Sequence, residues 1–303
     1  MQIFNTLKQT EYYTSVALGF FDGVHLGHQD VIKTAVNASS DVCKATVLTF
    51  NNSPSYILSG NKKPLLTTDE EKFKLFEKLG VEYVYCIDFN EVCSMTAEDF
   101  VREVLYDTLN AKFVIAGFNY HFGKGGNADA DDLISMCHSL KMDACKRTPV
   151  KYKDEPISST RIRECISNGE IETANAMLSY NFSITSKVTS GNHIGTTLST
   201  PTINQPLKSE IVTPKFGVYA SKVTVDDKVY LGATNIGTHP TVGKTEPLCE
   251  THLLNFDPGD LYGKNVKTEL LHFIRPEKKF DSLDELKNQI QRDKDDILTI
   301  LTK

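Results

Sequence analysis

The stretch that decides the fold is residues 19–28, which read G-F-F-D-G-V-H-L-G-H. It follows an apolar run, Val16–Phe20, that is typical of a strand, and a helical pattern begins after it at about Gly27. That pattern places apolar side chains on one helix face, namely Val31, Ile32, Ala35 and Val36. A strand, a glycine turn and a helix in this order predict one unit of a parallel α/β sheet.

The same alternation of strands and helices continues to about residue 180. Further strands are predicted at Ala45–Phe50, Val81–Phe89 and Phe113–Gly117. Thr68 and Glu71 form a capping box that opens a helix ending near Gly80, and Thr96 caps the next helix. We therefore predict a doubly wound parallel sheet with helices on both faces. Such sheets bind ligands beyond the carboxyl ends of their strands, and residues 19–28 lie at such an end.

The pattern changes near Tyr180. Strand-like runs joined by Gly, Pro, Asn and Asp follow at Ser183–Ser190, Gly217–Thr224, Val229–Thr234, Glu250–Phe256 and Val266–Ile274. Ser282 and Glu285 then open a final helix. The sequence predicts two domains: residues 1–180 with the parallel sheet, and residues 181–303 with a small antiparallel β-barrel and a C-terminal helix.

Composition narrows the class of protein. The length of 303 residues agrees with two domains of roughly 100–200 residues each. A net charge of −6 gives no reason to expect a nucleic-acid partner. Seven cysteines, an odd number without a C-x-x-C pair, favour reduced thiols in a cytoplasm. Residues 1–15 lack the pattern of a secretion signal, and no apolar run approaches the roughly 20 residues of a membrane span. We expect a cytoplasmic protein without membrane contact.

His25 and His28 lie three residues apart at the start of a helix, so both side chains can face the same way. The first turn of a helix offers free N–H groups and the positive end of the helix dipole, which suit a phosphate. Gly19, Gly23 and Gly27 would let a phosphate or nucleotide approach the backbone. Two imidazoles there can donate hydrogen bonds to oxygens that gain charge as phosphorus is attacked. The alternatives are a coincidental pair on a solvated face and a metal site, for which no third ligand stands at a usual spacing.

A second cluster, P-I-S-S-T-R-I-R at residues 156–163, opens another helix. Ser158, Ser159 and Thr160 carry hydroxyls typical of an N-cap and first turn. Arg161 and Arg163 follow directly, although the helix dipole disfavours cations near its N-terminus. Two interpretations stay open: an anion such as a nucleotide phosphate offsets their charge, or both arginines point into water.

Taken together, the two clusters resemble the signature of nucleotidylyl transferases with an H-x-G-H motif. Further motifs resemble, in the same order, the prokaryotic riboflavin kinase/FAD synthetase family: L-T-F, A-G-F-N-Y-H-F-G-K-G-G, P-T-I-N, N-I-G-T-H-P-T, E-T-H-L-L-N-F, D-L-Y-G and I-R-P-E-K-K-F. The resemblance spans nearly the whole chain. It implies a Rossmann-like first domain that transfers AMP from ATP to FMN, giving FAD and pyrophosphate, with Mg²⁺.

The resemblance also implies roles for residues of the first domain. His25, His28 and Arg161 would be catalytic, with the histidines on the ATP phosphates. Residues that would bind the nucleotide and its phosphates are Gly19, Phe20, Asp22, Gly23, Gly27, Ser159, Thr160, Arg161 and Arg163. The loop 117–123 would contact the flavin through Asn119 and Phe122. Because the FMN phosphate is itself the nucleophile, no serine or cysteine nucleophile is expected. The main departure is T-F-N-N-S-P, with Asn51 and Asn52, where the family usually has T-F-D-P-x-P.

In the second domain the family phosphorylates riboflavin, with a loop that usually reads G-x-G-R-x-L-G-F-P-T-A-N. Here residues 191–204 read G-N-H-I-G-T-T-L-S-T-P-T-I-N. By resemblance, Thr202 and Asn204 match the residues that hold Mg²⁺ and ATP. Glu250 matches the general base that activates the riboflavin hydroxyl.

Three positions of this loop depart from the family. Thr196 stands in place of an arginine, which removes a fixed charge next to polyphosphate. Ser199 and Thr200 replace a glycine and a phenylalanine, which restricts the backbone and removes an apolar surface. The linker Leu178–Tyr180 reads L-S-Y where the family has L-G-R.

These departures favour an FMN adenylyltransferase whose kinase domain is weak or lost. The alternative is the full bifunctional enzyme. A non-catalytic flavin or nucleotide sensor is a third hypothesis, and the intact His25, His28 and Arg161 count against it. Another H-x-G-H transferase, acting on phosphopantetheine or nicotinate mononucleotide, is disfavoured by the predicted barrel.

Overall fold

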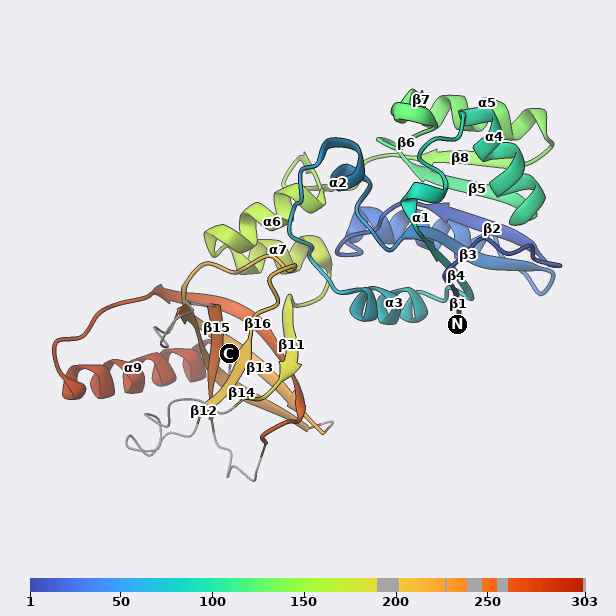
Figure 1. Cartoon of the computed structure of the whole chain (residues 1–303). Coiled ribbons are helices and arrows are strands. Elements are labelled where there is room, and N and C mark those ends of the chain that lie inside the picture. Colours follow the sequence, from blue (N-terminus) through green and yellow to red (C-terminus); the bar gives the residue numbers. More distant parts are fainter. Residues whose placement is uncertain (190–201, 227, 239–246, 255–260, 302–303) are drawn as a thin grey trace. The chain divides into compact units, whose positions relative to one another are not determined.

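The computed structural model describes residues 1–189, 202–226, 228–238, 247–254 and 261–301 (Figure 1). The chain divides into two compact units, Met1–Ser159 and Thr160–Lys303. This division falls earlier than the predicted boundary near Tyr180, because two helices, α6 (Ser159–Asn168) and α7 (Ile171–Leu178), pack with the second unit. The amide of Lys215 donates to the carbonyl of Ile166 on α6 (3.1 Å), and the Asn175 side chain on α7 donates to the carbonyl of Leu270 (2.8 Å).

A six-stranded sheet in the order β1-β4-β3-β2-β5-β8 forms the centre of the first unit. The strands are β1 (Gln2–Phe4), β2 (Tyr13–Leu18), β3 (Cys43–Phe50), β4 (Tyr83–Ile87), β5 (Ala111–Gly117) and β8 (Asp143–Arg147). Every strand pair in it is parallel. The predicted doubly wound sheet is therefore confirmed.

Alternate side chains of the strands enter two different cores. On β2, Ala17 joins the core formed with α1 (Leu26–Asn37) and α3 (Asp69–Lys78), whereas Val16 and Leu18 join the opposite core. The opposite core includes side chains of α4 (Ala97–Asp99), of its π-helical continuation η2 (Phe100–Thr108) and of α5 (Ala130–Ser139). The shorter elements of this unit are α2 (Pro54–Ser59), η1 (Phe89–Glu91), β6 (His121–Phe122), η3 (Lys124–Gly126), β7 (Ala128–Asp129), β9 (Lys151–Tyr152) and β10 (Glu155–Pro156).

The second unit contains an antiparallel sheet of six described strands in the order β11-β16-β13-β14-β15-β12. They are β11 (Ser183–Lys187), β12 (Thr202–Pro206), β13 (Gly217–Val225), β14 (Lys228–Thr238), β15 (Pro247–Leu254) and β16 (Asn265–Pro276). Thr189, just after β11, bonds through its amide to the carbonyl of Asn204 on β12 (2.8 Å), so the two edge strands meet and the sheet nearly closes. The C-terminal helix α9 (Leu283–Leu301) packs on β16 through the ion pair of Arg275 with Asp293. The predicted barrel and final helix are confirmed.

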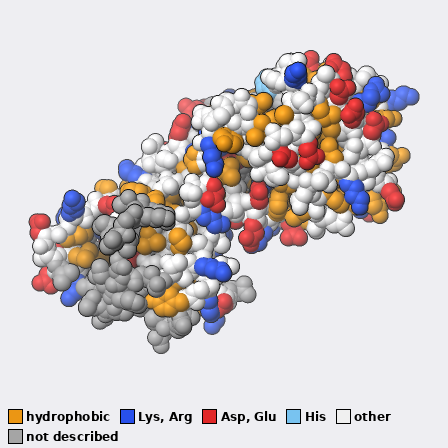
Figure 2. Space-filling view, viewed as in Figure 1, with side chains coloured by type: hydrophobic (Ala, Val, Ile, Leu, Met, Phe, Trp, Pro, Cys, Tyr) orange, Lys and Arg blue, Asp and Glu red, His pale blue; other side chains and the backbone are white. Residues whose placement is uncertain are grey.

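Charged side chains of both signs are interspersed on the face that Figure 2 shows, with apolar side chains scattered among them. Among the described residues of this face, no large patch of a single sign gathers. The prediction that the protein does not bind nucleic acid stays a prediction.

Candidate active site

The turn between β2 and α1 has an unusual backbone. Three of its residues have positive φ angles: Phe21 (+56°), Gly23 (+81°) and Val24 (+38°). Glycine adopts this region easily, but a β-branched valine there is strained. Strain of this kind persists only where the surrounding structure fixes the backbone, and it concentrates at functional sites.

Hydrogen bonds from distant segments fix this turn. The buried carboxylate of Asp22 accepts from the amide of Leu66 (2.8 Å), and the amide of Gly23 donates to the hydroxyl of Thr67 (3.3 Å). The carbonyl of Asp22 accepts from the hydroxyl of Ser159 (2.9 Å), while that of Phe20 accepts from Thr49 (3.0 Å). Two of the predicted nucleotide-binding residues, Asp22 and Ser159, are thus in direct contact.

His25 and His28 meet at the start of α1. The Nδ1 atom of His25, the N-cap residue, accepts from the amide of His28 (3.3 Å). Their rings stack with centroids 3.6 Å apart and planes inclined by 17°. An ideal Cβ at Gly27 would lie 3.2 Å from the His25 ring, and one at Gly19 would lie 2.9 Å from the Phe21 ring. These two glycines therefore make room for aromatic rings of the turn itself, in addition to the predicted approach of a phosphate or nucleotide.

The environment of His28 disfavours its charged form. Burial is the largest cause that lowers the pKa of His28 well below its ordinary value, followed by the neighbouring His25 and by the ammonium of Lys72. His28 is therefore neutral near pH 7. Its Nδ1 atom is buried and has no hydrogen-bond partner among the described residues. A buried polar atom without a partner is uncommon, and it marks His28 as a candidate functional residue.

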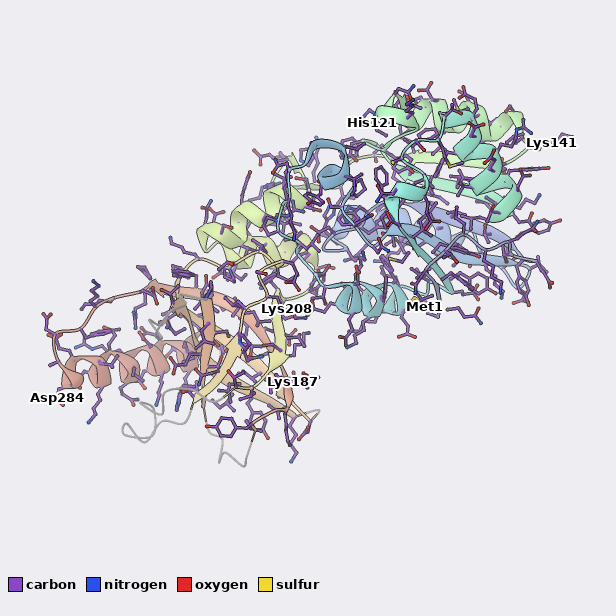
Figure 3. The ribbon with its side chains drawn as sticks, in the orientation of Figure 1. Met1, His121, Lys141, Lys187, Lys208 and Asp284 are labelled. Atoms are coloured by element: carbon purple, nitrogen blue, oxygen red, sulfur yellow. The ribbon has the colours of Figure 1, made fainter. Side chains whose placement is uncertain are left out.

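The loop after β5 carries the two residues assigned to the flavin. Asn119 is exposed, and its neighbour Phe118 is 46% exposed. Phe122 is buried, with its ring centroid 5.6 Å from that of Phe100 and 5.9 Å from that of Tyr120. His121, labelled in Figure 3, is exposed beside it on β6. Phe122 therefore belongs to a buried aromatic group behind the exposed part of the loop.

The arginine cluster lies at the start of α6, which begins at Ser159, within the stretch predicted to open a helix. Thr160 is exposed, whereas Arg161 and Arg163 are half-buried. Ile162 between them is fully buried. The helix thus packs through its apolar face and leaves its first turn at the surface.

The predicted kinase residues converge on neighbouring strands of the barrel. The hydroxyl of Thr202 donates to Oε1 of Glu250 (3.1 Å). Asn204, 7% exposed, is the register partner of Glu250 across β12 and β15. On the other side of Glu250 the register partner is Asn235 of β14, which the sequence analysis did not single out. Thr196, Ser199 and Thr200 lie outside the described residues.

Two further polar residues, Lys72 and Asn52, were not among the predicted site residues. Lys72 on α3 is almost completely buried. Its position four residues before Phe76, on the apolar face of that helix, is the feature of the sequence that could have indicated this burial. Asn52, noted as a departure from the family, bridges two strand ends: its Nδ2 atom donates to Asp88 (2.8 Å) and its Oδ1 atom accepts from the amide of Phe89 (2.9 Å).

A glycine turn that leads from a parallel strand into a helix capped by the first histidine of H-x-G-H defines a nucleotidyltransferase of the H-x-G-H class. Two family models match the chain: FAD synthetase over residues 7–161 and riboflavin kinase over residues 178–301. The chain therefore belongs to the bifunctional riboflavin kinase/FMN adenylyltransferase family, and the resemblance of its motifs is confirmed.

Individual relatives agree with this membership. The bifunctional riboflavin kinase/FMN adenylyltransferase of Bacillus subtilis is 35% identical, over 96% of this chain and 94% of the relative. The protein of the same name from Escherichia coli K12 is 33% identical, over 92% and 90%. A crystal structure from Streptococcus pneumoniae, described as a macrolide-efflux protein, is 31% identical with a TM-score of 0.88 over 97% of each chain. None of the described helices of the present chain is both long and apolar enough to cross a membrane.

Proposed function

We propose that the first unit transfers AMP from ATP to FMN, giving FAD and pyrophosphate. The observation that supports this most is the stacked pair of His25 and His28 at the start of α1. In this reaction an oxygen of the FMN phosphate attacks the α-phosphorus of ATP, and the bond from that phosphorus to the bridging oxygen breaks. Negative charge grows on the departing pyrophosphate. Imidazole N–H groups and the free amides of the first helical turn would donate hydrogen bonds to those oxygens.

The remaining roles in this reaction follow the same chemistry. Ser159 is tied to the Asp22 carbonyl, and with Thr160 and Arg161 it would hold the nucleotide phosphates. Asn119 would contact the flavin from the exposed part of its loop. Phe122 would support that loop from the buried aromatic group behind it.

For the second unit, we propose a riboflavin kinase site that is weak or lost. The departures at Thr196, Ser199 and Thr200 support this proposal. The second candidate is the full bifunctional enzyme, and the contact between Thr202 and Glu250 beside Asn204 favours it.

Mg²⁺ fits the oxygen donors of that site. The hydroxyl of Thr202 and the amide oxygen of Asn204 are hard ligands, and Mg²⁺ ordinarily takes few protein ligands besides phosphates and water. When bound there, Mg²⁺ would neutralise charge on the ATP phosphates. Glu250 would accept the proton of the riboflavin hydroxyl.

A product assay tests both proposals. The purified protein receives ATP and Mg²⁺ with riboflavin in one tube and FMN in the other, and the products are separated by chromatography. FAD from FMN alone supports the monofunctional proposal, whereas FMN and FAD from riboflavin support the bifunctional enzyme. No product in either tube would favour the sensor hypothesis.

Two variants assign the products to their sites. His28→Ala should reduce FAD formation by orders of magnitude while the protein stays folded. Glu250→Gln should leave FAD formation from FMN nearly unchanged, because Glu250 belongs to the barrel. A large loss of FAD formation in Glu250→Gln would contradict this division of labour.

All seven cysteines are free thiols. Burial is the main cause that raises the pKa values of six of these thiols and makes them poor nucleophiles: Cys43, Cys86, Cys137, Cys145, Cys165 and Cys249. Free thiols are usual in a reducing cytoplasm, and we propose that location for this protein.

A further inference from the structure

Gln29 is a buried polar side chain next to the histidine pair. It follows His28 on α1, and only 8% of it is exposed. A side-chain amide is costly to bury unless its polar atoms are hydrogen-bonded. Its Nε2 atom donates to the carbonyl of Val24, at a distance of 2.9 Å. The side chain of Gln29 therefore reaches back from the helix to the strained turn that precedes it.

The main chain of Gln29 binds the next carbonyl along the chain. Its amide donates to the carbonyl of His25 (2.8 Å), as is usual for an N-cap residue and its helix. The carbonyls of Val24 and His25 belong to the two peptide groups on either side of the His25 Cα. Gln29 thus binds the backbone on both sides of His25, once through its side chain and once through its main chain. These two bonds fix the backbone angles of His25, a φ of −65° and a ψ of 171°.

The conformation of Val24 depends on such a bond. Its φ of +38° is in the left-handed region, which a β-branched residue adopts only with strain. Its amide donates to the carbonyl of Phe21 (3.1 Å), and its side chain is fully buried in the core shared with α1. Without the bond from Gln29, the peptide group between Val24 and His25 would be free to rotate and release this strain. Rotation of that peptide group would change the position of His25.

The imidazole ring of His25 occupies a narrow space. Its Nδ1 atom accepts from the amide of His28 (3.3 Å), so the neutral ring carries its proton on Nε2. On one face the ring stacks on that of His28, with 3.6 Å between the centroids. An ideal Cβ at Gly27 would already lie 3.2 Å from the ring. A change in the backbone of His25 would therefore disturb the stacking contact and the bond that selects the Nε2–H tautomer.

We propose that Gln29 is a positioning residue for His25: its side-chain amide holds the carbonyl of Val24 and so fixes the histidine ring, with its proton on Nε2, for the phosphate oxygens of ATP. This role rests on the proposed adenylyl transfer. Charge on the departing pyrophosphate grows as its bond to the α-phosphorus breaks, so a fixed donor there acts mainly in the transition state. Loss of the bond from Gln29 should therefore lower kcat and change the KM for FMN little.

Steady-state kinetics of FAD formation from FMN and ATP test this role. Gln29→Met keeps a side chain of similar length and removes the amide that donates to Val24. It should lower kcat roughly 10- to 100-fold, because a displacement of about 1 Å can cost about 100-fold in rate. Gln29→Asn, whose amide is one methylene shorter, is the second variant if Gln29→Met does not fold, and the same loss of kcat is expected. A wild-type kcat in a folded variant, or a loss confined to KM, overturns the proposal.

Gln205→Met is the matched control. Gln205 of β12 is also fully buried, and its Nε2 atom donates to a main-chain carbonyl, that of Val266, at 2.8 Å. The same substitution therefore removes the same kind of bond within the barrel. Both variants should unfold at lower urea concentrations than the wild type, because each leaves a buried carbonyl without a donor. Only Gln29→Met should lose FAD formation from FMN. Equal losses of kcat in the two variants would show an effect of stability alone and would refute the positioning role.

NMR shifts of the ring nitrogens of His25 give a second readout, without any substrate. Spectra are recorded about two pH units above the ordinary histidine pKa of about 6.5, where the ring is neutral. The chain has eight histidines, and a His25→Gln variant assigns the signals of His25.

The wild type and Gln205→Met should show the Nε2–H form of His25, whereas Gln29→Met and Gln29→Asn should show a mixture with the Nδ1–H form. An unchanged tautomer in a folded Gln29 variant contradicts the proposal. If the wild type forms no FAD, the proposed function fails, and these spectra still decide whether Gln29 fixes the ring of His25.

Discussion

Gly27→Ala is the sharpest test of how the histidine pair is built. Gly27 is the second residue of α1, and no left-handed backbone angle is needed there. A Cβ at this position would lie 3.2 Å from Cε1 and 3.3 Å from Nδ1 of His25. Ordinary contacts of a Cβ are longer, so the imidazole must move by a few tenths of an ångström. Nδ1 is also the atom that accepts from the amide of His28.

Stability and activity should respond differently to this change. Alanine is favoured over glycine in a helix by up to about 1 kcal/mol. Forcing the His25 ring off its rotamer costs about 0.5–1.5 kcal/mol. The free energy of unfolding should therefore stay within about 1 kcal/mol of the wild type. A displacement of about 1 Å can lower a rate about 100-fold, so a smaller shift of His25 should lower kcat/KM for FAD formation about 10-fold.

The assay measures FAD formation from FMN and ATP beside urea unfolding of the same samples. Lys33→Ala, at an exposed position of α1, is the control that raises helix propensity without touching His25. Wild-type turnover in Gly27→Ala would refute the argument that the position of the His25 ring matters. A loss of stability above about 3 kcal/mol would show that the site cannot accommodate even a small shift of the ring. It would contradict the change of less than about 1 kcal/mol expected from helix propensity and rotamer strain.

Other predictions concern pH and stability. Because the pKa of His28 in the folded protein lies below its ordinary 6.5, the unfolded chain binds this proton first, so the free energy of unfolding should fall as the pH drops below about 6.5. Urea unfolding at several pH values should show a shallower fall in His28→Gln. Asp293→Ala should cost about 3 kcal/mol by urea unfolding, since it removes the buried carboxylate of α9 that pairs with Arg275 of β16 through two hydrogen bonds. Ser179→Gly should stabilise by about 0.5 kcal/mol in thermal unfolding, because Ser179 ends α7 with a φ of +63°.

Local signals in the sequence predicted most of the fold. The capping box of Thr68 and Glu71 is present with both of its hydrogen bonds, because a cap depends on residues three apart in the chain. Apolar periodicity likewise placed the strand that ends at Leu18 and the helix that follows the glycine turn. Such features depend on neighbours in sequence, so one chain suffices to find them.

Contacts between distant segments were not predictable in the same way. Lys72 of α3 lies beside the ring of Phe20 from the glycine turn, and no local pattern in the sequence predicts that contact. The π-helical form of η2 was likewise missed: Phe100–Thr108 has the apolar spacing expected of an ordinary helix. Contacts of this kind depend on tertiary packing, which overrides local preference.

Contacts between distant segments also connect the glycine turn with Ser159. The turn holds Phe21 and Val24 in strained conformations, which persist only if other segments bind the backbone between them. Ser159, from the I-S-S-T-R motif, supplies one such bond to the carbonyl of Asp22, and Leu66 supplies another to its carboxylate. A loss of Ser159 should therefore loosen the histidine turn as well as any phosphate contact of α6. Ser159 therefore stabilises the turn that carries the histidines, in addition to its proposed contact with the nucleotide phosphates.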